Sequence, residues 1–148
     1  MKNKKISLLS LLCAGILLLS GCGNGNSRNP RSLTGADRDN HGCIPSAGYT
    51  WSEVRKDCIR LWEEGVRTEN PTDSTQVTYL VFSPDSLQVE LFFSDDRPNE
   101  ILHRRPLPAG GHAWNVEDDD TKNVRLQDGI WTVSRRGKLL YRQTEGHQ

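Results

Sequence analysis

The sequence has few of the residue patterns that build catalytic or metal sites. The histidines are scattered without the spacing of a paired metal ligand, at His41, His103, His112 and His147. Ser46-Ala47-Gly48 lacks the Gly-x-Ser-x-Gly pattern of a nucleophile elbow. Acid–base pairs involving Glu53, Glu63, Glu64 or Glu90 would be expected by chance in any β-protein of this size. We therefore predict a binding protein without enzymatic activity, cofactor or bound metal.

The chain also lacks a net charge and a long apolar run. Its 19 Lys and Arg residues balance 19 Asp and Glu residues, so neither nucleic acid nor an acidic membrane surface is a favoured partner. The apolar run from Ile6 to Leu19 spans 14 residues. At about 1.5 Å per residue this run is too short to cross a hydrocarbon core of roughly 30 Å. Because Lys2, Lys4 and Lys5 precede it, the run is typical of an export signal over residues 1–21.

The end of this run, Leu19-Ser20-Gly21-Cys22, resembles the bacterial lipobox. The resemblance implies cleavage before Cys22, a diacylglyceryl thioether on its sulfur and an acylated amine. Several acyl chains together give stable membrane anchoring, whereas one chain binds only marginally. An ordinary signal peptide with a chance cysteine is the alternative.

Cleavage before Cys22 would leave a mature chain with different properties. It would carry 16 basic and 19 acidic residues, a net charge of −3. Residues 22–40 are polar and rich in Gly and Asn, which predicts a flexible tether ahead of the folded part. Gly23 stands where Asp would signal inner-membrane retention. We therefore expect an outer-membrane lipoprotein that faces the periplasm.

The segment 41–67 contains two cysteines, Cys43 and Cys58. Because the export signal and the lipid anchor account for the other two, this pair meets an oxidising compartment in which disulfides persist. We predict a disulfide that stabilises the fold by about 3 kcal/mol in the chain-entropy model. Zinc binding would need ligands beyond His41, and a reactive thiol would need a base partner; both remain alternatives.

Local patterns in the rest of the chain predict β-structure. Within the segment 41–67, Ser52 and Glu53 favour a turn or short helix over 52–57, followed by a strand over 58–62. From Thr75 onward, β-branched and aromatic runs alternate with turn signals. The expected strands are 75–82, 87–93, 101–103, 113–116, 124–126, 130–134 and 139–143. Asp128-Gly129 predicts a two-residue hairpin between two of them.

The strand 87–93 illustrates how one face is expected to be buried. Leu87, Val89 and Leu91 alternate with Gln88 and Glu90, so the apolar set should face the core and the polar set the solvent. No convincing amphipathic helix interrupts the series. We therefore predict a mostly β fold, a small antiparallel β-barrel or sandwich over residues 72–143 with an N-terminal disulfide-stapled segment.

The strand and turn pattern of residues 75–143, together with the lipobox, resembles the family of membrane-bound inhibitors of c-type lysozyme. In that family a Ser-Gly-x-x-Tyr loop and a Lys-Gly turn on a small antiparallel β-barrel enter the lysozyme cleft. The nearest matches are Ala109-Gly110-Gly111-His112-Ala113-Trp114 and Arg136-Gly137. The binding residues that the resemblance implies are Ala109, Gly110, Gly111, His112, Arg135, Arg136 and Lys138.

The chain departs from the family pattern at both parts of this site. Ala109 replaces the loop serine, and Arg136 replaces the turn lysine while keeping its charge. In the implied mechanism, Arg136 would pair with a catalytic carboxylate of the lysozyme while the loop at 109–112 blocks its substrate. The segment 42–67 lies outside the resemblance and is similar instead to a Cys–SAGY–W–Cys–IR module of small envelope lipoproteins.

Several other features leave alternatives open. The acidic run at 117–120 is expected to be a solvated hairpin tip, with calcium binding or docking of a basic partner as alternatives. The four tryptophans are expected mainly in the core, with sugar stacking as the alternative; they are Trp51, Trp62, Trp114 and Trp131. The second functional hypothesis is a structural or assembly lipoprotein that docks on another envelope protein through residues 43–62.

Overall fold

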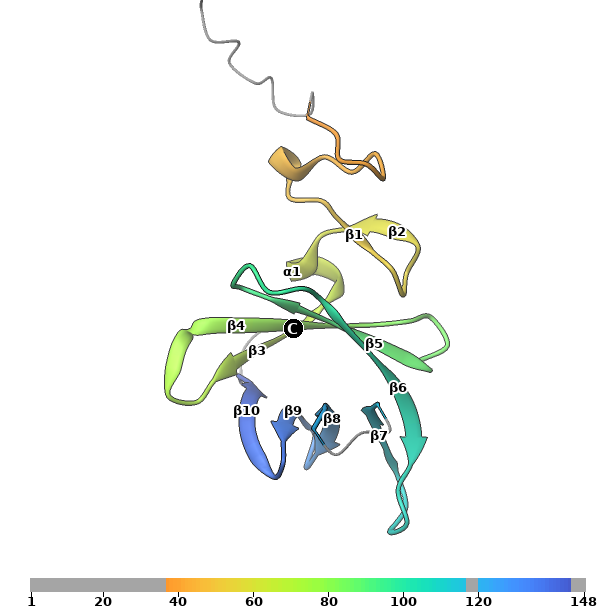
Figure 1. The fold of residues 1–148 in the computed structure, drawn as a ribbon, viewed down its shortest axis with the longest axis vertical. Coiled ribbons are helices and arrows are strands. Elements are labelled where there is room, and N and C mark those ends of the chain that lie inside the picture. Colours follow the sequence, from red (N-terminus) through yellow and green to blue (C-terminus); the bar gives the residue numbers. More distant parts are fainter. Residues whose placement is uncertain (1–36, 117–119, 145–148) are drawn as a thin grey trace, which may run out of the picture. The chain divides into compact units, whose positions relative to one another are not determined.

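The computed structural model describes residues 37–116 and 120–144. The predicted export signal, the predicted lipidation site Cys22 and most of the predicted tether lie outside the described residues. Within them, eight antiparallel strands close into a barrel, which confirms the mostly β prediction (Figure 1). The barrel strands are β3 (Val66–Asn70), β4 (Asp73–Phe82), β5 (Gln88–Phe93), β6 (Glu100–Pro106), β7 (His112–Asn115), β8 (Lys122–Gln127), β9 (Ile130–Arg135) and β10 (Lys138–Gln143).

The barrel strands follow one another around the wall in sequence order, and β10 closes the ring against β3. Because consecutive strands are antiparallel, their connections alternate between the two ends of the barrel. The β3–β4, β5–β6, β7–β8 and β9–β10 connections share one end, here named the β9–β10 end. The β4–β5, β6–β7 and β8–β9 connections share the other, named the β6–β7 end.

Two hairpins are set by residues with left-handed backbone. Asp128 and Gly129 have φ of 51° and 79°, and Arg136 and Gly137 have φ of 49° and 75°. Positive φ at both central residues is the geometry of a type I′ turn, whose twist matches that of the flanking strands. The predicted Asp128-Gly129 hairpin is therefore confirmed, with Gln127 opposite Ile130.

A smaller N-terminal module precedes the barrel. It consists of a 3₁₀ turn at η1 (Pro45–Ala47), a two-stranded hairpin of β1 (Thr50–Ser52) and β2 (Asp57–Ile59), and the short helix α1 (Leu61–Glu64). The predicted disulfide is present and joins Cys43 to Cys58. None of the helices in the described residues is long and apolar enough to span a bilayer.

The module agrees with its sequence prediction in one place and differs from it in two. The predicted turn is found after Ser52, where Ser52 Oγ accepts a 3.3 Å hydrogen bond from Arg55 N. The strand expected over 58–62 ends at Ile59, because Arg60 N-caps α1 and Gly65 N closes the helix on Leu61 O. The barrel then begins at Val66, within residues that the sequence assigned to the module rather than to the domain 72–143.

The barrel interior is filled by apolar side chains from all its sides. The buried cluster is Leu80, Val89, Leu91, Leu102, Trp114, Val124, Val133 and Tyr141. Toward the β6–β7 end, Phe82, Trp114 and Trp131 pack with ring centroids 4.6 to 5.5 Å apart. Toward the β9–β10 end, buried Lys122 pairs with Glu100 and lies 5.0 Å from the centre of the Phe93 ring.

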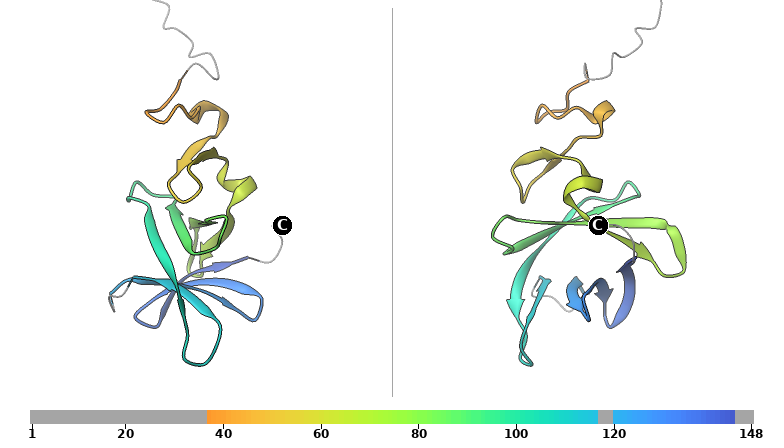
Figure 2. Two further views of the ribbon diagram at one scale, coloured as in Figure 1. Left: turned by 90° about the vertical axis from the view of Figure 1, so that its right-hand side faces the viewer. Right: turned by 180° about the vertical axis from the view of Figure 1, so that it is seen from behind.

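Strand β5 does not show the one-sided burial that its sequence predicts. Leu87 precedes the strand and is 49% exposed, whereas Glu90 is 1% exposed. The outer side of β4 and β5 is covered by the module, in a second cluster of Val54 and Ile59 with Val81 and Phe92. In both turned views the module lies on the β4–β5 side, away from β8–β10 (Figure 2). Both faces of β5 are therefore buried.

Candidate functional site

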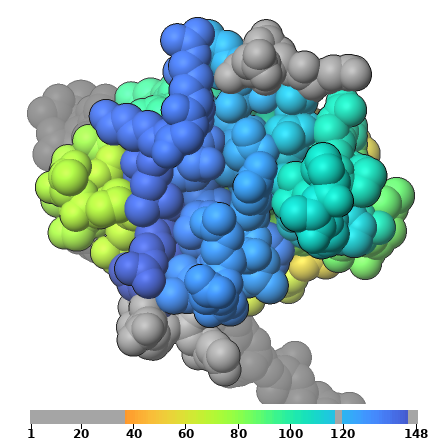
Figure 3. All heavy atoms as spheres, turned by 90° about the horizontal axis from the view of Figure 1, so that it is seen from below, coloured from red at the N-terminus to blue at the C-terminus, as the bar shows by residue number. Residues whose placement is uncertain are grey.

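The candidate site lies on the outer face of strands β8, β9 and β10. Figure 3 views the molecule from this side, where these strands form a continuous surface between the β3–β4 turn and the β6–β7 hairpin. Val124 and Val133 point into the barrel, so their neighbours Arg125 and Thr132 point outward. Arg125 and Arg142 are both paired in register with Thr132, one from each side. Arg125 and Arg142 therefore occupy the positions on either side of Thr132 in a single cross-strand row.

The geometry of this row suits one shared anion. Neighbouring strands are about 4.8 Å apart, which places the Arg125 and Arg142 backbones about 10 Å from each other. Both side chains border a shallow groove of about 420 Å³ that also contains Thr132, Ser134 and Leu139. Guanidinium groups recognise carboxylates and phosphates bidentately. The row can therefore bind an acidic group between its two arginines.

The Arg125 side chain is half-buried and forms no ion pair within the described residues. Its Nε is buried and has no hydrogen-bond partner there, as is also the case for Nε of Arg55. Thr132 Oγ1 lies 3.3 Å from Arg125 O and 3.1 Å from Gln127 Oε1, so the hydroxyl is oriented by the same strand.

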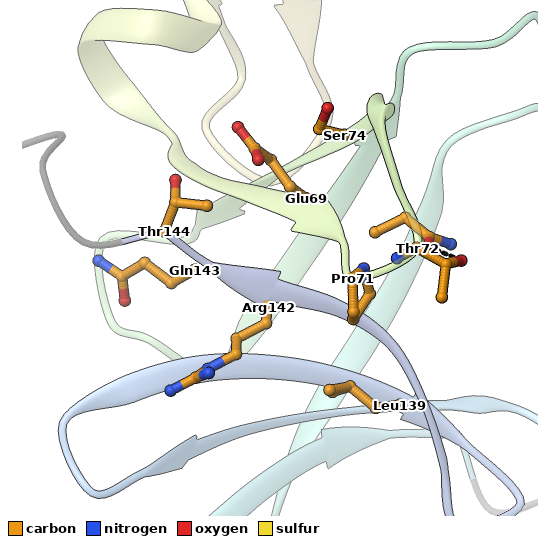
Figure 4. A pocket seen from close by; sticks show the side chains of 9 residues that line it. Glu69, Pro71, Thr72, Ser74, Leu139, Arg142, Gln143 and Thr144 are labelled. Atoms are coloured by element: carbon orange, nitrogen blue, oxygen red, sulfur yellow. Dashed lines mark hydrogen bonds between the residues drawn. The ribbon is translucent and has the colours of Figure 1, made fainter.

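The carboxylate opposite Arg142, that of Glu69, pairs with another residue. Glu69 is the cross-strand partner of Arg142 on β3, yet the Glu69 carboxylate forms an ion pair with Arg67. Figure 4 shows the Arg142 side chain directed away from Glu69, at the border of a polar groove of about 730 Å³ beside the β3–β4 turn. Within the described residues, neither Arg125 nor Arg142 takes part in an ion pair.

The predicted basic turn adjoins this face. Arg135 Nη2 and Arg136 Nε both lie 2.9 Å from Asp120 Oδ1, on the β7–β8 connection. One carboxylate is thus shared by two guanidinium groups. Lys138 begins β10, opposite Arg135, and is exposed. Arg135, Arg136 and Lys138 therefore extend the basic surface toward the β9–β10 end.

The other half of the predicted site is not brought to this surface. Ala109, Gly110, Gly111 and His112 are exposed in the β6–β7 connection, closed by hydrogen bonds between Leu107 and the two glycines. That connection lies at the β6–β7 end of the barrel, whereas Arg136 lies at the β9–β10 end. The two parts that the family resemblance combines into one plug are therefore separated by the length of the strands between them.

Sequence reasoning missed Arg125 and Arg142. The Asp128-Gly129 hairpin by itself places Arg125 opposite Thr132, and this pairing was available from the sequence. Arg142 depends on a register shift between Leu139 and Tyr141. Without that bulge, Tyr141 would face Thr132 and Arg142 would point into the barrel. The bulge puts the tyrosine in the core and the arginine outside.

The remaining candidates are dispersed. Glu53, Glu63 and Glu64 form ion pairs with Lys56, Arg60 and Arg55 in turn, and no metal-binding cluster of His, Cys, Asp or Glu occurs in the part of the chain that the structure describes. Residues 117–119 of the acidic run lie outside that part. Trp114 and Trp131 belong to the barrel interior as expected, but Trp51 stacks on His41 and Trp62 is 60% exposed.

The protein is thus a small closed antiparallel β-barrel with a disulfide-stapled module. Its candidate site is the outer face of strands β8–β10. Comparisons with models of protein families, with curated proteins and with solved structures find no match for this chain.

Proposed function

We propose that this protein is a lipid-anchored binding protein of the bacterial cell envelope that acts without catalysis. In this proposal, the outer face of β8–β10 binds an acidic group of a partner protein. The observation that supports it most is the row Arg125–Thr132–Arg142, with two guanidinium groups that have no ion-pair partner within the described residues. Arginines in that state attract carboxylates and fix their orientation.

The first partner to test is a c-type lysozyme, whose cleft contains catalytic carboxylates. The sequence resemblance supports this choice, and the closed barrel agrees with it. The binding element differs from the one that the resemblance implies, because the loop at 109–112 and the turn at Arg136 lie at opposite ends. The proposal therefore keeps the basic turn and the adjoining face as the inhibitory surface and leaves the loop out.

The second hypothesis, docking through residues 43–62, has less support. The apolar residues of that module, Val54 and Ile59, already pack against Val81 and Phe92 of the barrel. A partner would therefore have to use its polar outer side. On the barrel face, Arg125 and Arg142 form no ion pair within the described residues. We therefore favour this face as the binding surface.

The decisive experiment is a titration of lipid-free protein, residues 23–148, into a c-type lysozyme turnover assay. We expect stoichiometric inhibition that weakens with salt, because exposed charges are screened. Arg142→Glu should abolish it, and Arg136→Ala should weaken it. Lys56→Glu is the matched control, since it makes the same charge change in the module, on an exposed side chain.

The outcomes separate the two parts of the proposal. Absence of inhibition at high protein concentration would eliminate lysozyme as the partner. Inhibition that Arg142→Glu and Lys56→Glu leave equally intact would exclude the β8–β10 face as the binding surface.

Anchoring is tested separately by Cys22→Ser, which should move the protein from the membrane fraction to the soluble fraction of the envelope.

A further inference from the structure

The largest exposed apolar side chain in the described residues is Trp62, on α1. It is 60% exposed, whereas Trp114, inside the barrel, is 7% exposed. An isolated exposed leucine needs no explanation, but an indole exposes far more apolar surface. Its position therefore raises the question of what it contacts.

The tip of the Trp62 ring packs closely against Gly48. A Cβ at position 48 would lie 2.0 Å from Trp62 Cη2 and 2.9 Å from Cζ2, so the ring tip occupies the space that any other residue would fill. Gly48 also has φ of 82°, which favours glycine. The indole is thus supported from one side. A fixed aromatic surface loses little conformational entropy when it binds a ligand.

A groove of about 590 Å³ lies beside the ring, between α1 and strands β3 and β4. This volume is in the range of small-ligand sites. Val66, Gly65 and Tyr79 supply apolar lining, and the polar groups come from Glu63, Glu64, Arg67 and Gln143. The groove therefore combines an exposed aromatic surface with several hydrogen-bonding groups along its border.

The polar border retains unused hydrogen-bonding capacity. Glu64 contacts Arg55 only at 3.4 Å, and its side chain is 48% exposed. An ionised carboxylate can accept about four hydrogen bonds. The Gln143 Oε1 already accepts from Trp131 N at 3.1 Å, whereas its Nε2 can still donate. Hydroxyl groups match such a border well. Glu63, Glu64 and Arg67 are each paired with an opposite charge, on Arg60, Arg55 and Glu69 in turn, so the border has no surplus charge that would favour an ionic ligand.

We infer that this groove binds a neutral or N-acetylated oligosaccharide, with one sugar ring stacked on Trp62. A sugar presents an apolar C–H face to the indole and hydroxyl groups at its edge to Glu64 and Gln143. This site is distinct from the β8–β10 face, and the inference does not depend on the proposed function. An acidic glycan would gain nothing from its charge, because Arg67, the basic residue that lines the groove, is already paired with Glu69.

The test is an NMR titration of residues 23–148 with the trisaccharides of N-acetylglucosamine and of glucose, following the four indole N–H signals. We expect one signal to move, and that signal to disappear in Trp62→Phe. Trp62→Ala should weaken binding at least about tenfold, which corresponds to about 1.4 kcal/mol, and Trp62→Phe should weaken it less. A trisaccharide of uronic acids should bind no better than the neutral ones.

Two further variants separate stacking from loss of structure. Gly48→Ala leaves the indole in the chain but displaces its ring, so it should reduce binding as Trp62→Ala does. Trp51→Phe, in the same module, should leave binding unchanged. Far-UV circular dichroism and the intact disulfide would verify folding of each variant. If neither neutral trisaccharide shifts the Trp62 signal, or if that signal moves only with protein concentration, the inference is wrong.

Discussion

Glu90 is an acidic side chain on the outer side of β5 that is nevertheless 1% exposed. Ser52 Oγ donates to its Oε2 at 2.8 Å, Val54 N at 3.3 Å, and Asn99 Nδ2 donates to its Oε1 at 3.2 Å. A buried carboxylate is tolerated only when such donors surround it. Two of the three donors belong to the N-terminal module, so this single residue connects the module to the barrel wall.

We predict that Glu90→Ala lowers the free energy of unfolding by about 2–4 kcal/mol, because it leaves buried donors without an acceptor. Glu90→Gln keeps an acceptor oxygen and should cost less. Urea denaturation would measure both changes. Glu53→Ala, at an exposed acid of the N-terminal module, is the control and should stay within about 0.5 kcal/mol of the parent protein. Equal effects at positions 53 and 90 would contradict the role given to Glu90.

Asp85 shows a different residue-scale effect, on the exposed β4–β5 turn. Its carboxylate accepts hydrogen bonds from Ser83 Oγ at 2.6 Å and from Leu87 N at 2.9 Å. The hydrogen bond from Ser83, followed by that from Leu87 N, lowers the pKa of Asp85 below its ordinary value of 3.8. Because the folded pKa is the lower one, this carboxylate stabilises the fold above pH 3.8 and loses that contribution as the pH falls through its folded pKa.

The corresponding prediction compares the parent protein with Asp85→Asn, which keeps an acceptor but cannot ionise. We expect the parent to melt at the higher temperature at neutral pH. The difference should shrink toward zero as the pH falls below 3.8, where the aspartate of the unfolded chain is protonated. Thermal melts followed by circular dichroism over this pH range would measure it. A difference independent of pH would show that charge at this position does not matter.

At the scale of elements, the two type I′ turns determine how β8, β9 and β10 align. Both turn glycines, Gly129 and Gly137, have open space where a Cβ would lie. Substitution there therefore changes only the backbone preference and removes no packing. The alignment matters for the proposed binding face, because the first turn sets Arg125 opposite Thr132.

We predict that Gly129→Ala and Gly137→Ala each lower the free energy of unfolding by about 1–2 kcal/mol, the cost of a left-handed backbone for a residue with a Cβ. Gly129→Asn should cost less, since Asn adopts this conformation more readily. Urea denaturation is again suitable. Stability unchanged by the alanine substitutions would mean that the turns are not of the I′ type.

At the scale of the whole molecule, the module and the barrel share a core. Ile59 of β2 packs in the same cluster as Phe92 of β5, on the outer side of the barrel wall. Val133, in contrast, belongs to the cluster inside the barrel. We therefore expect residues 43–144 to unfold as one cooperative unit rather than as a module and a separate domain.

A double-mutant cycle tests this expectation. Ile59→Ala and Phe92→Ala should be coupled by about 0.5–3 kcal/mol, the range for residues in contact. Ile59→Ala and Val133→Ala form the control pair and should be additive within about 0.5 kcal/mol. Additivity in both cycles would show that the module contributes independently of the barrel.

Much of the fold was predictable because its signals are local. The alternation in Thr75–Phe82, the turn at Ser83–Ser86 and the Asp128-Gly129 hairpin all depend on neighbours in sequence. The burial of β5 was not predictable in this way. Glu90 and Phe92 are covered by residues more than 30 positions earlier, and no local period reports a contact of that kind.

The sequence by itself determined the strand pattern, the Cys43–Cys58 pairing and the presence of a basic turn, because alternation, cysteine count and turn residues act over a few positions. Only the tertiary structure decided which residues share a surface. Closure of the barrel placed the loop at 109–112 and the turn at Arg136 at opposite ends. The bulge between Leu139 and Tyr141 turned Arg142 outward beside Arg125, because a shift of one residue exchanges the two faces of a strand.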